Sequence, residues 1–441
     1  MNRGLLFINA VFGGLAQKAC FQYNRDIALR STEREGISLA ENKDFIHRFL
    51  NYVQIDTQSD EDATDQPTTA KQRALAELLE KELQSLGAWT DYDREHCYVY
   101  AAIASHGSGF ESMPPLGFIA HLDTSPEVSG SSVKPRIIQN YQGGDALLKE
   151  EDFPELTRHR GEDLIASDGT TLLGADDKAG IAEIMNLVQY FHDHPEEPHR
   201  AVRIAFTPDE ETGRGTEHFD TERFGAKEAY TVDGGTFGVI EYECFNAAEA
   251  RVMIHGKNVH PGSAKNQMKN ACLIAMEFAS MLPPAETPEH TEGYEGFYHL
   301  DRMEGSVEQT NLQYIIRDHD RERFEARKET IRSIAAYLNQ KYGEGTVDAS
   351  IRDQYYNMAE VMKDHMDLVG RVQKVLSDMG EVCVTSPIRG GTDGAALCFR
   401  GIPCPNLCTG GYNYHSRFEY ASVQEMEKTA EMLIRIAQLR Q

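Results

Sequence analysis

Basic residues are scarce in this chain of 441 residues, where 44 lysines and arginines stand against 70 aspartates and glutamates. The resulting formal net charge of -26 repels the phosphate backbone of nucleic acids and the anionic surface of membranes. We therefore expect neither nucleic acid nor membrane among its partners. Hydrophobic residues (40%) and charged residues (26%) occur in the proportions of an ordinary globular protein, which excludes a disordered or fibrous chain.

Paired cysteines are missing as well. The eight cysteines show neither a CxxC pair nor a framework spacing, which indicates reduced thiols in a reducing compartment. Cys404 and Cys408 lack the second pair that a zinc knuckle needs. We therefore expect a cytoplasmic protein.

A long hydrophobic run is also missing, even near the N-terminus. Residues 1–16, MNRGLLFINAVFGGLA, have the outline of a weak signal peptide and are too short to span a bilayer. An amphipathic helical pattern with Phe45, Phe49 and Val53 on one face begins only at Glu41. Residues 1–41 are therefore interpreted as an extension, and three explanations stay open: a signal peptide that leaves export possible, a genuine extension or a misplaced start.

Short apolar runs alternate with helical patterns through the first half of the chain. The runs cover 97–103, 116–120, 201–207 and 229–232, and helical patterns cover 69–86 and the segment after Ala179. Strands that alternate with helices predict an α/β fold, with a mostly parallel sheet and helices on both faces.

The pattern changes near Cys244. Strands are expected over 250–256, over 313–318 and up to Tyr356, and helices over 264–281 and 320–342. The order strand–helix–strand–strand–helix–strand predicts an inserted α+β lid of the ferredoxin-like type. The expected domains are the extension (1–41), a catalytic domain in two parts (42–244 and 358–441) and the lid between them (245–357).

Histidine and acidic residues follow four apolar, strand-like runs, at the point where each run ends. They are His121 with Asp123, Asp176 with Asp177 after the run 171–175, Glu210 with Glu211, and Asp233. The carboxyl ends of the strands of an open α/β sheet form its ligand crevice, so we expect these clusters to converge. His415, which follows the glycine-rich TGGYNY, is a fifth candidate.

Each cluster alone has an ordinary structural explanation: a surface hydrogen bond, a helix cap, a solvated loop or a turn. Together they offer two imidazoles and three carboxylates, a ligand set that zinc accepts. Five ligands are too many for one tetrahedral zinc with an open position, whereas two metals about 3.5–4 Å apart that share one aspartate use all five. The spacing leaves open whether Asp176 or Asp177 is shared, and the spare glutamate is a candidate general base.

Motifs around these residues resemble the peptidase T family of tripeptide aminopeptidases, within the di-zinc aminoacylase and carboxypeptidase clan. The matching stretches run in order from about residue 42 to the C-terminus. They are GFIAHLDTSPEVSG, TLLGADDKAGIAEIM, AFTPDEETGRG, YTVDGG, NVHPGSAKNQMKNA, EGYEGFYHL, YIIRDHDR, PIRGGTDGA and CPNLCTGGYNYH. The resemblance implies one zinc on His121, Asp176 and Asp233, and a second zinc on Glu211, His415 and the shared Asp176.

The resemblance also implies roles for residues that bind no metal. Glu210 would be the general base and Asp123 would orient the metal-bound imidazole. His260, in the lid, would stabilise the oxyanion, in some relatives across a dimer. Arg317 and Arg389 are candidates for binding the peptide carboxylate, with a structural ion pair as the equal alternative.

The implied activity is release of the N-terminal residue from tripeptides, by attack of a metal-bound water with a glutamate as base. The alternative is a related aminoacylase, dipeptidase or carboxypeptidase with the same metal site, because the ligands do not separate these activities. A catalytically silent binding protein is a third possibility, but it predicts loss of the base or of a ligand, and all are present. Two Zn²⁺ per chain are expected, although Co²⁺ or Mn²⁺ suit the same ligands. The expected partners are small peptides and, through the lid, a second copy of the chain.

Overall fold

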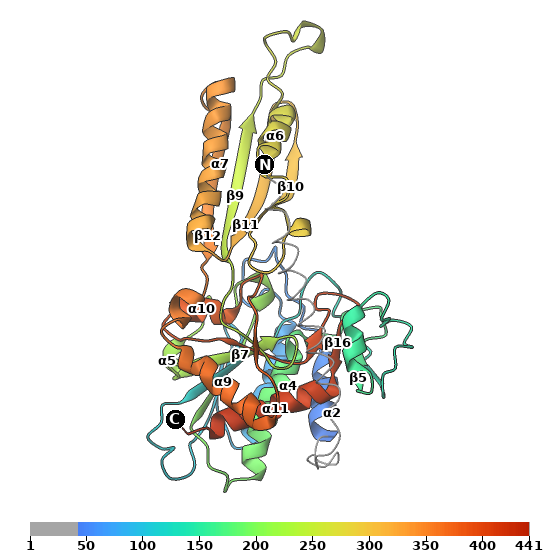
Figure 1. Cartoon of the computed structure of the whole chain (residues 1–441), viewed down its shortest axis with the longest axis vertical. Coiled ribbons are helices and arrows are strands. Elements are labelled where there is room, and N and C mark those ends of the chain that lie inside the picture. The colour runs from blue at the N-terminus through green and yellow to red at the C-terminus, as the bar shows by residue number, and fades with distance from the viewer. Residues whose placement is uncertain (1–42, 441) are drawn as a thin grey trace, which may run out of the picture. The chain divides into compact units, whose positions relative to one another are not determined.

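The computed structural model describes residues 43–440 (Figure 1), so the predicted extension 1–41 lies outside the described residues. Within that range, eight strands form a mixed sheet. Their order across the sheet is β1 (Trp89–Asp93), β2 (Tyr98–Ile103), β6 (Val202–Thr207), β3 (Leu116–His121), β7 (Ala229–Gly234), β14 (Asn406–Cys408), β8 (Val239–Glu241) and β13 (Val384–Thr385). The strands β6, β3, β7 and β14 run parallel, and β13 runs parallel to β8. The hairpin β1–β2 joins β6 antiparallel, and β8 joins β14 antiparallel. The α/β fold with a mostly parallel central sheet is thus confirmed.

Helices cover both faces of this sheet. Phe118 of β3 stacks on Tyr230 of β7, whose hydroxyl donates to the carbonyl of Leu368. The preceding residue, Gly117, lies against the ring of Phe224, and a side chain at position 117 would collide with that ring. Because neighbouring residues of a strand point to opposite faces, α9 (Met366–Met379) and α5 (Thr221–Phe224) lie on opposite sides. The other helices of this part are α2 (Lys43–Val53), α3 (Gln72–Ser85), α4 (Ala175–Asp193), α8 (Ala359–Met362), α10 (Asp393–Phe399) and α11 (Val423–Gln438).

The lid has the predicted element order. The chain runs β9 (Asn246–His255), α6 (Ala271–Ser280), β10 (Phe297–Gly305), β11 (Gln309–Asp318), α7 (Arg321–Tyr342) and β12 (Val347–Tyr355). The strands pair antiparallel in the order β10-β11-β9-β12, which is the ferredoxin-like topology. Apolar residues of α6 and α7, such as Phe278 and Leu338, share a buried cluster with Leu312 and Ile316 of β11.

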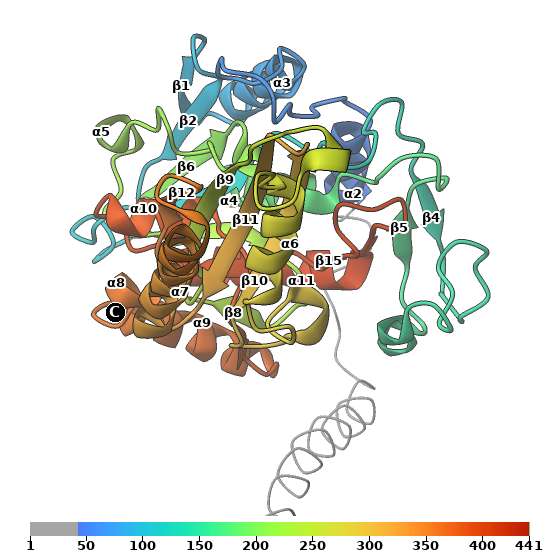
Figure 2. The ribbon, with the colours of Figure 1, turned by 90° about the horizontal axis from the view of Figure 1, so that it is seen from above.

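A third, small sheet is not anticipated by the sequence. It joins β15 (Gly411–Tyr412), β16 (Tyr420–Ser422), β5 (Leu164–Ala166) and β4 (Arg136–Ile138), all antiparallel. Figure 2 shows β4 and β5, from the first half of the chain, on the same side of the molecule as β15 from its C-terminal part, and β16 joins β15 to β5. Tyr141, Leu148 and Leu156 pack with Tyr412 and Tyr420 in its buried core. This layer carries the loop that contains His415.

Two local predictions are wrong. Residues 171–175 form no strand: the chain passes through an irregular segment in which Gly174 has a positive φ of 84°, and α4 begins at Ala175. The predicted helix 264–281 begins only at Ala271. Lys257 and Lys269 exchange backbone hydrogen bonds (2.7 and 3.0 Å), which closes 257–269 into a loop, and the Asn270 side chain then caps α6.

Short 3₁₀ turns complete the described elements. They are η1 (Pro154–His159), η2 (Glu210–Thr212), η3 (Pro261–Ser263) and η4 (Pro288–His290). Among residues 43–440, no helix combines the length and the apolar character needed to cross a bilayer.

Candidate metal centre

Adjacent parallel strands bring the predicted clusters to one edge of the central sheet. β3 ends at His121, β7 carries Asp233 near its end, and β6 leads into the turn η2, which begins at Glu210. β6 and β7 both pair with β3, so the three carboxyl ends lie side by side. The convergence that the sequence predicts is therefore observed for these strands.

Asp176 lies between the two histidines. One oxygen of its carboxylate is 2.9 Å from His121 Nε2, and the other is 3.2 Å from His415 Nε2. Each imidazole faces a second carboxylate with the same nitrogen: His121 faces Asp233 at 3.4 Å, and His415 faces Glu211 at 2.9 Å. The five residues thus form two nitrogen and oxygen clusters that share one carboxylate.

The structure also separates the two adjacent aspartates. Asp177 accepts a hydrogen bond from the His121 backbone N–H (3.1 Å) with one oxygen and from the Gly180 N–H (3.1 Å) with the other. It therefore caps the start of α4 and fixes the end of β3. Asp176 contacts both histidine side chains, one with each oxygen, whereas Asp177 lies near one histidine, His121, and near Asp233.

Asp123 holds two parts of the centre together. Its two oxygens accept the backbone N–H groups of Glu210 (3.0 Å) and Glu211 (3.2 Å). His121 Nδ1 lies 3.0 Å from the Asp123 carbonyl oxygen and 3.3 Å from its carboxylate. This fully buried side chain therefore orients the imidazole and the turn of the two glutamates at once.

The buried carboxylates of the cluster lie close together, an arrangement that a bound cation would stabilise. Burial and the charge of Asp176 raise the pKa of Glu211 to about 8, and burial raises that of Asp233 to about 6. Burial alone would lower the pKa of His121, but the charge of Asp233 and hydrogen bonds to Asp123, Asp176 and Asp233 raise it well above its ordinary value. Glu211 Oε1 is buried and has no hydrogen-bond partner among the described residues. Buried carboxylates without partners are costly, and a divalent cation would satisfy them.

Close relatives cover nearly the whole chain. Peptidase T of Caldanaerobacter subterraneus subsp. tengcongensis is 50% identical over 402 residues, which span 89% of this chain and 98% of that protein. Peptidase T of Geobacillus sp. strain WCH70 is 50% identical over 404 residues, which span 90% and 98%. The chain belongs to the peptidase T family. It is therefore a peptidase, and the resemblance found in the sequence is confirmed.

Solved structures share the fold of this peptidase T family member. Aminopeptidase PepT from Bacillus cereus superposes with a TM-score of 0.70 at 23% identity, over 89% of this chain and 97% of that one. A dinuclear metal-binding peptidase of the M20 family from Bacillus subtilis superposes with a TM-score of 0.63 at 14% identity, over 91% and 98%. Residues 242–346 match the peptidase dimerisation domain, and this range falls on the ferredoxin-like lid.

The remaining predicted site residues lie apart from the metal cluster in their described contacts. His260 is exposed in the loop 257–269, and its Nδ1 accepts the Gly262 N–H at 3.1 Å. Arg317 is half-buried, with Nη1 donating to the carbonyls of Ile316 (3.0 Å) and Ala248 (3.4 Å). Their roles toward a substrate stay predictions.

Arg389 has an evident structural role. Its guanidinium donates to the carbonyls of Gly293 (2.8 Å), Glu295 (2.9 Å) and Thr291 (3.3 Å) and to the Thr291 hydroxyl (2.9 Å). It also lies over the ring of Phe245, 5.1 Å from its centroid. These contacts fasten the segment after α9 to a loop of the lid.

Sequence reasoning assigns no role to several buried carboxylates beside the cluster, of which Asp209 and Glu419 hold its backbone. Asp209, in a left-handed conformation (φ 58°), accepts hydrogen bonds from the Thr68 N–H (2.9 Å), the Thr68 hydroxyl (2.5 Å) and the Gln72 amide (2.6 Å). It thereby fixes the residue before Glu210. Glu419 binds the segment before α4. A signal for Asp209 exists in the motif TPDEE, but nothing near Glu419 in the sequence marks it.

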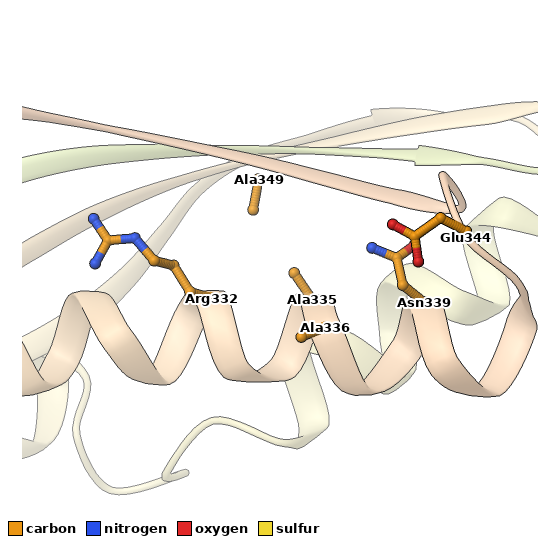
Figure 3. A pocket seen from close by; sticks show the side chains of 6 residues that line it. All are labelled: Arg332, Ala335, Ala336, Asn339, Glu344 and Ala349. Carbon is orange, nitrogen blue, oxygen red and sulfur yellow. The ribbon is translucent and has the colours of Figure 1, made fainter.

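Two other features offer no comparable site. His159, Glu162 and Glu425 lie near one another, but Glu425 already accepts from Arg158 (3.1 Å) and Tyr412, and Glu162 accepts from the Ser422 hydroxyl. A pocket of about 320 Å³ lies between α7 and β12 (Figure 3). Its lining is Arg332, Ala335, Ala336, Asn339, Glu344 and Ala349. The Asn339 amide is occupied by both backbone groups of Val347, so little is left there to bind a ligand.

Proposed function

We propose that the chain is an aminopeptidase that releases the N-terminal residue of tripeptides with the help of two divalent cations. His121, Asp176 and Asp233 would hold one ion, and Glu211, His415 and the same Asp176 the other. Zinc suits this mixture of imidazole and carboxylate ligands, and Co²⁺ or Mn²⁺ are alternatives. The relatives named peptidase T support this substrate class, and the solved aminopeptidase PepT supports cleavage at the N-terminus.

One observation carries the proposal: the two oxygens of Asp176 face the Nε2 atoms of two different histidines, at 2.9 and 3.2 Å. One histidine would be enough for an ordinary ion pair with this carboxylate. Two imidazoles, each with a further carboxylate, fit a pair of ions that share a bridge. Glu211 Oε1 fits the same arrangement, because this buried oxygen has no hydrogen-bond partner among the described residues and could coordinate an ion.

Glu210 is the proposed general base. Bound ions would polarise the scissile carbonyl and acidify a water molecule, which is the chemistry that such pairs supply. Glu210 is not among the close ion-pair contacts of the two histidines, and Asp123 fixes its backbone at 3.0 Å. It is therefore free to accept the proton of the attacking water and to return it to the leaving amine. Burial and the charge of Asp233 raise the pKa of Glu210, which favours such an exchange.

Three residues of the proposal recognise the substrate. His260 would donate a hydrogen bond to the carbonyl oxygen as negative charge develops there. Arg317 would bind the C-terminal carboxylate of the peptide, and its Nη1 already has backbone partners that hold the guanidinium in place. Arg389 is the second candidate for this role, although its hydrogen-bond partners belong to the lid loop.

We also propose a homodimer formed through the lid, in the cytoplasm. The match of 242–346 to the peptidase dimerisation domain supports the contact surface. The division into a catalytic domain (42–244 and 358–441) and an inserted lid (245–357) is supported by the separate four-stranded sheet of β9–β12. His260, exposed on that lid, would then be able to serve the partner's centre.

A peptide panel tests the activity. Tripeptides, dipeptides, N-acetylated tripeptides and N-acyl amino acids are compared with the native enzyme, after chelation and after return of Zn²⁺. We expect N-terminal cleavage of free tripeptides, loss on chelation and recovery with the ion. Glu210→Gln should lower kcat at least a hundredfold while both ions remain bound. Cleavage that survives exhaustive chelation, or a preference for acylated substrates, would refute the proposal.

A further inference from the structure

Glu419 joins the two halves of the metal centre without touching either histidine. One of its carboxylate oxygens accepts the backbone N–H groups of Leu173 and Gly174, both at 2.8 Å. The other accepts the backbone N–H of Asp176 at 3.0 Å. The residue is 1% exposed, so these three donors and the charge of the buried Lys178 surround it in place of water.

The segment that Glu419 binds is irregular: Leu173 and Gly174 precede α4, and Asp176 has non-helical backbone angles within the first turn of that helix. Gly174 has a positive φ of 84°, and a Cβ there would lie 3.3 Å from the Thr124 side chain. The backbone N–H groups of Leu173, Gly174 and Asp176 therefore point to one place, where the two carboxylate oxygens of Glu419 accept all three. Without Glu419, the backbone that presents Asp176 would lose three charge-assisted hydrogen bonds.

The loop 413–419, which carries His415, also depends on contacts that fix its ends. Asn413 and His415 both adopt left-handed backbone conformations, with φ of 55° and 56°, which residues other than glycine reach only at a cost. Such conformations persist where the surroundings determine them. Within the loop, the Ser416 hydroxyl donates to the Asn413 carbonyl at 2.6 Å, and the Glu419 N–H donates to the Ser416 carbonyl at 3.3 Å. Glu419 is thus the point where the loop is attached to the segment of Asp176.

We infer that Glu419 is a positioning residue of the metal centre, which sets the distance between His415 Nε2 and the Asp176 carboxylate by binding the backbone of residues 173–176. This inference rests on the proposed two-ion function. It assigns Glu419 a role in how tightly the ion between His415 and Asp176 is held. Groups that orient metal ligands typically change metal affinity by about ten- to a hundredfold when they are altered.

The test measures Zn²⁺ binding directly, by competition with a chromophoric chelator, on the full-length chain first stripped of metal. Glu419→Gln keeps the size of the side chain but turns an N–H donor toward one of the three backbone donors. We expect the dissociation constant of one ion to rise about ten- to a hundredfold. Glu419→Asp keeps the charge with a shorter reach, and it should show a smaller rise of the same constant. It also serves if the glutamine variant does not fold.

Glu425→Gln is the matched control. Glu425 is a carboxyl of similar burial (9% exposed) next to the same small sheet, but its partners are Arg158, Tyr412 and the Phe237 N–H. It should lower the melting temperature of the metal-free chain and leave both Zn²⁺ dissociation constants within twofold. A merely structural role of Glu419 predicts the same pattern for its own variants.

The outcomes separate the two proposals. A native chain that binds two Zn²⁺, while both Glu419 variants bind them equally tightly, overturns the positioning role and leaves the proposed function standing. A native chain that binds no Zn²⁺, Co²⁺ or Mn²⁺ overturns the two-ion function and the inference with it.

Discussion

The turn that carries Glu210 depends on Asp209, and substitution of Asp209 should damage both stability and turnover. Asp209 is fully buried and accepts hydrogen bonds from three donor groups, the Thr68 N–H, the Thr68 hydroxyl and the Gln72 amide. Its left-handed backbone (φ 58°) is tolerated better by aspartate and asparagine than by alanine.

The magnitude follows from these contacts. A hydrogen bond to a charged group contributes about 1.5–3 kcal/mol, but water reaches the partly exposed Thr68 and replaces part of that loss. Gln72 is fully buried, so its amide would lose its partner outright. The left-handed alanine adds about 1 kcal/mol. Asp209→Ala should therefore lower the free energy of unfolding by about 3–5 kcal/mol, and Asp209→Asn, which keeps shape and one acceptor, by about 1–2 kcal/mol.

Urea unfolding and steady-state kinetics on a tripeptide check this. We expect kcat of Asp209→Asn to fall about tenfold or more at nearly constant KM, because Glu210 shifts relative to the substrate. Asp320→Ala is the control: it removes an exposed cap of α7, where Asp320 accepts the Arg323 N–H at 2.8 Å. It should cost about 1 kcal/mol and leave kcat unchanged. If Asp209→Ala lies within 1 kcal/mol of the native chain, the reasoning is refuted.

Three further predictions concern ions, pH and the lid. Removal of divalent ions should lower the melting temperature, because an ion at a hundred times its dissociation constant adds about 2.7 kcal/mol to the free energy of unfolding. Scanning calorimetry with and without Zn²⁺ checks this, and equal melting temperatures would contradict it. Hydrogen bonds from Arg136 lower the pKa of Asp145 to about 2, so its contribution to stability is present above the unfolded value of 3.8 and is lost as pH falls toward 2. Asp145→Asn should therefore lose less stability than the native chain over that range, and equal losses in pH-dependent urea unfolding would contradict it. Arg389→Ala should speed proteolytic cleavage within residues 287–296, because the Arg389 guanidinium holds Thr291 and Gly293 of that loop. Arg417→Ala is the control, since Arg417 lies over Phe418 and should not affect this cleavage. Mass spectrometry of the first fragments measures both rates, and equal rates would contradict the prediction.

Local sequence patterns were enough to predict which residues lie at the carboxyl ends of the central strands. Apolar runs that end at His121 and before Glu210 and Asp233 are strands in the structure, and their parallel pairing brings those residues together. The lid order was readable for the same reason, because its long strands and helices have strong periodicities.

The rest depends on contacts between distant segments. The run 171–175 is apolar because it is buried, yet its backbone hydrogen-bonds to Glu419 instead of to a neighbouring strand. Periodicity cannot distinguish these cases. The small sheet consists of strands of two or three residues, which are too short to leave a pattern. The choice between Asp176 and Asp177 likewise required the neighbours: one faces two imidazoles, the other caps a helix.

The attachment of Glu419 has a consequence for how the chain is made. Gly174 and Glu419 are 245 positions apart, so their hydrogen bond closes a very long loop. The strands β3, β6 and β7 all precede residue 235, so they can pair early in synthesis. Glu419, with His415 shortly before it, leaves the ribosome 245 residues after Gly174. A nascent chain that ends before Asn406 lacks β14 of the central sheet and His415 of the cluster. Under the proposed two-ion function, metal loading would then report that the chain has been synthesised beyond Glu419.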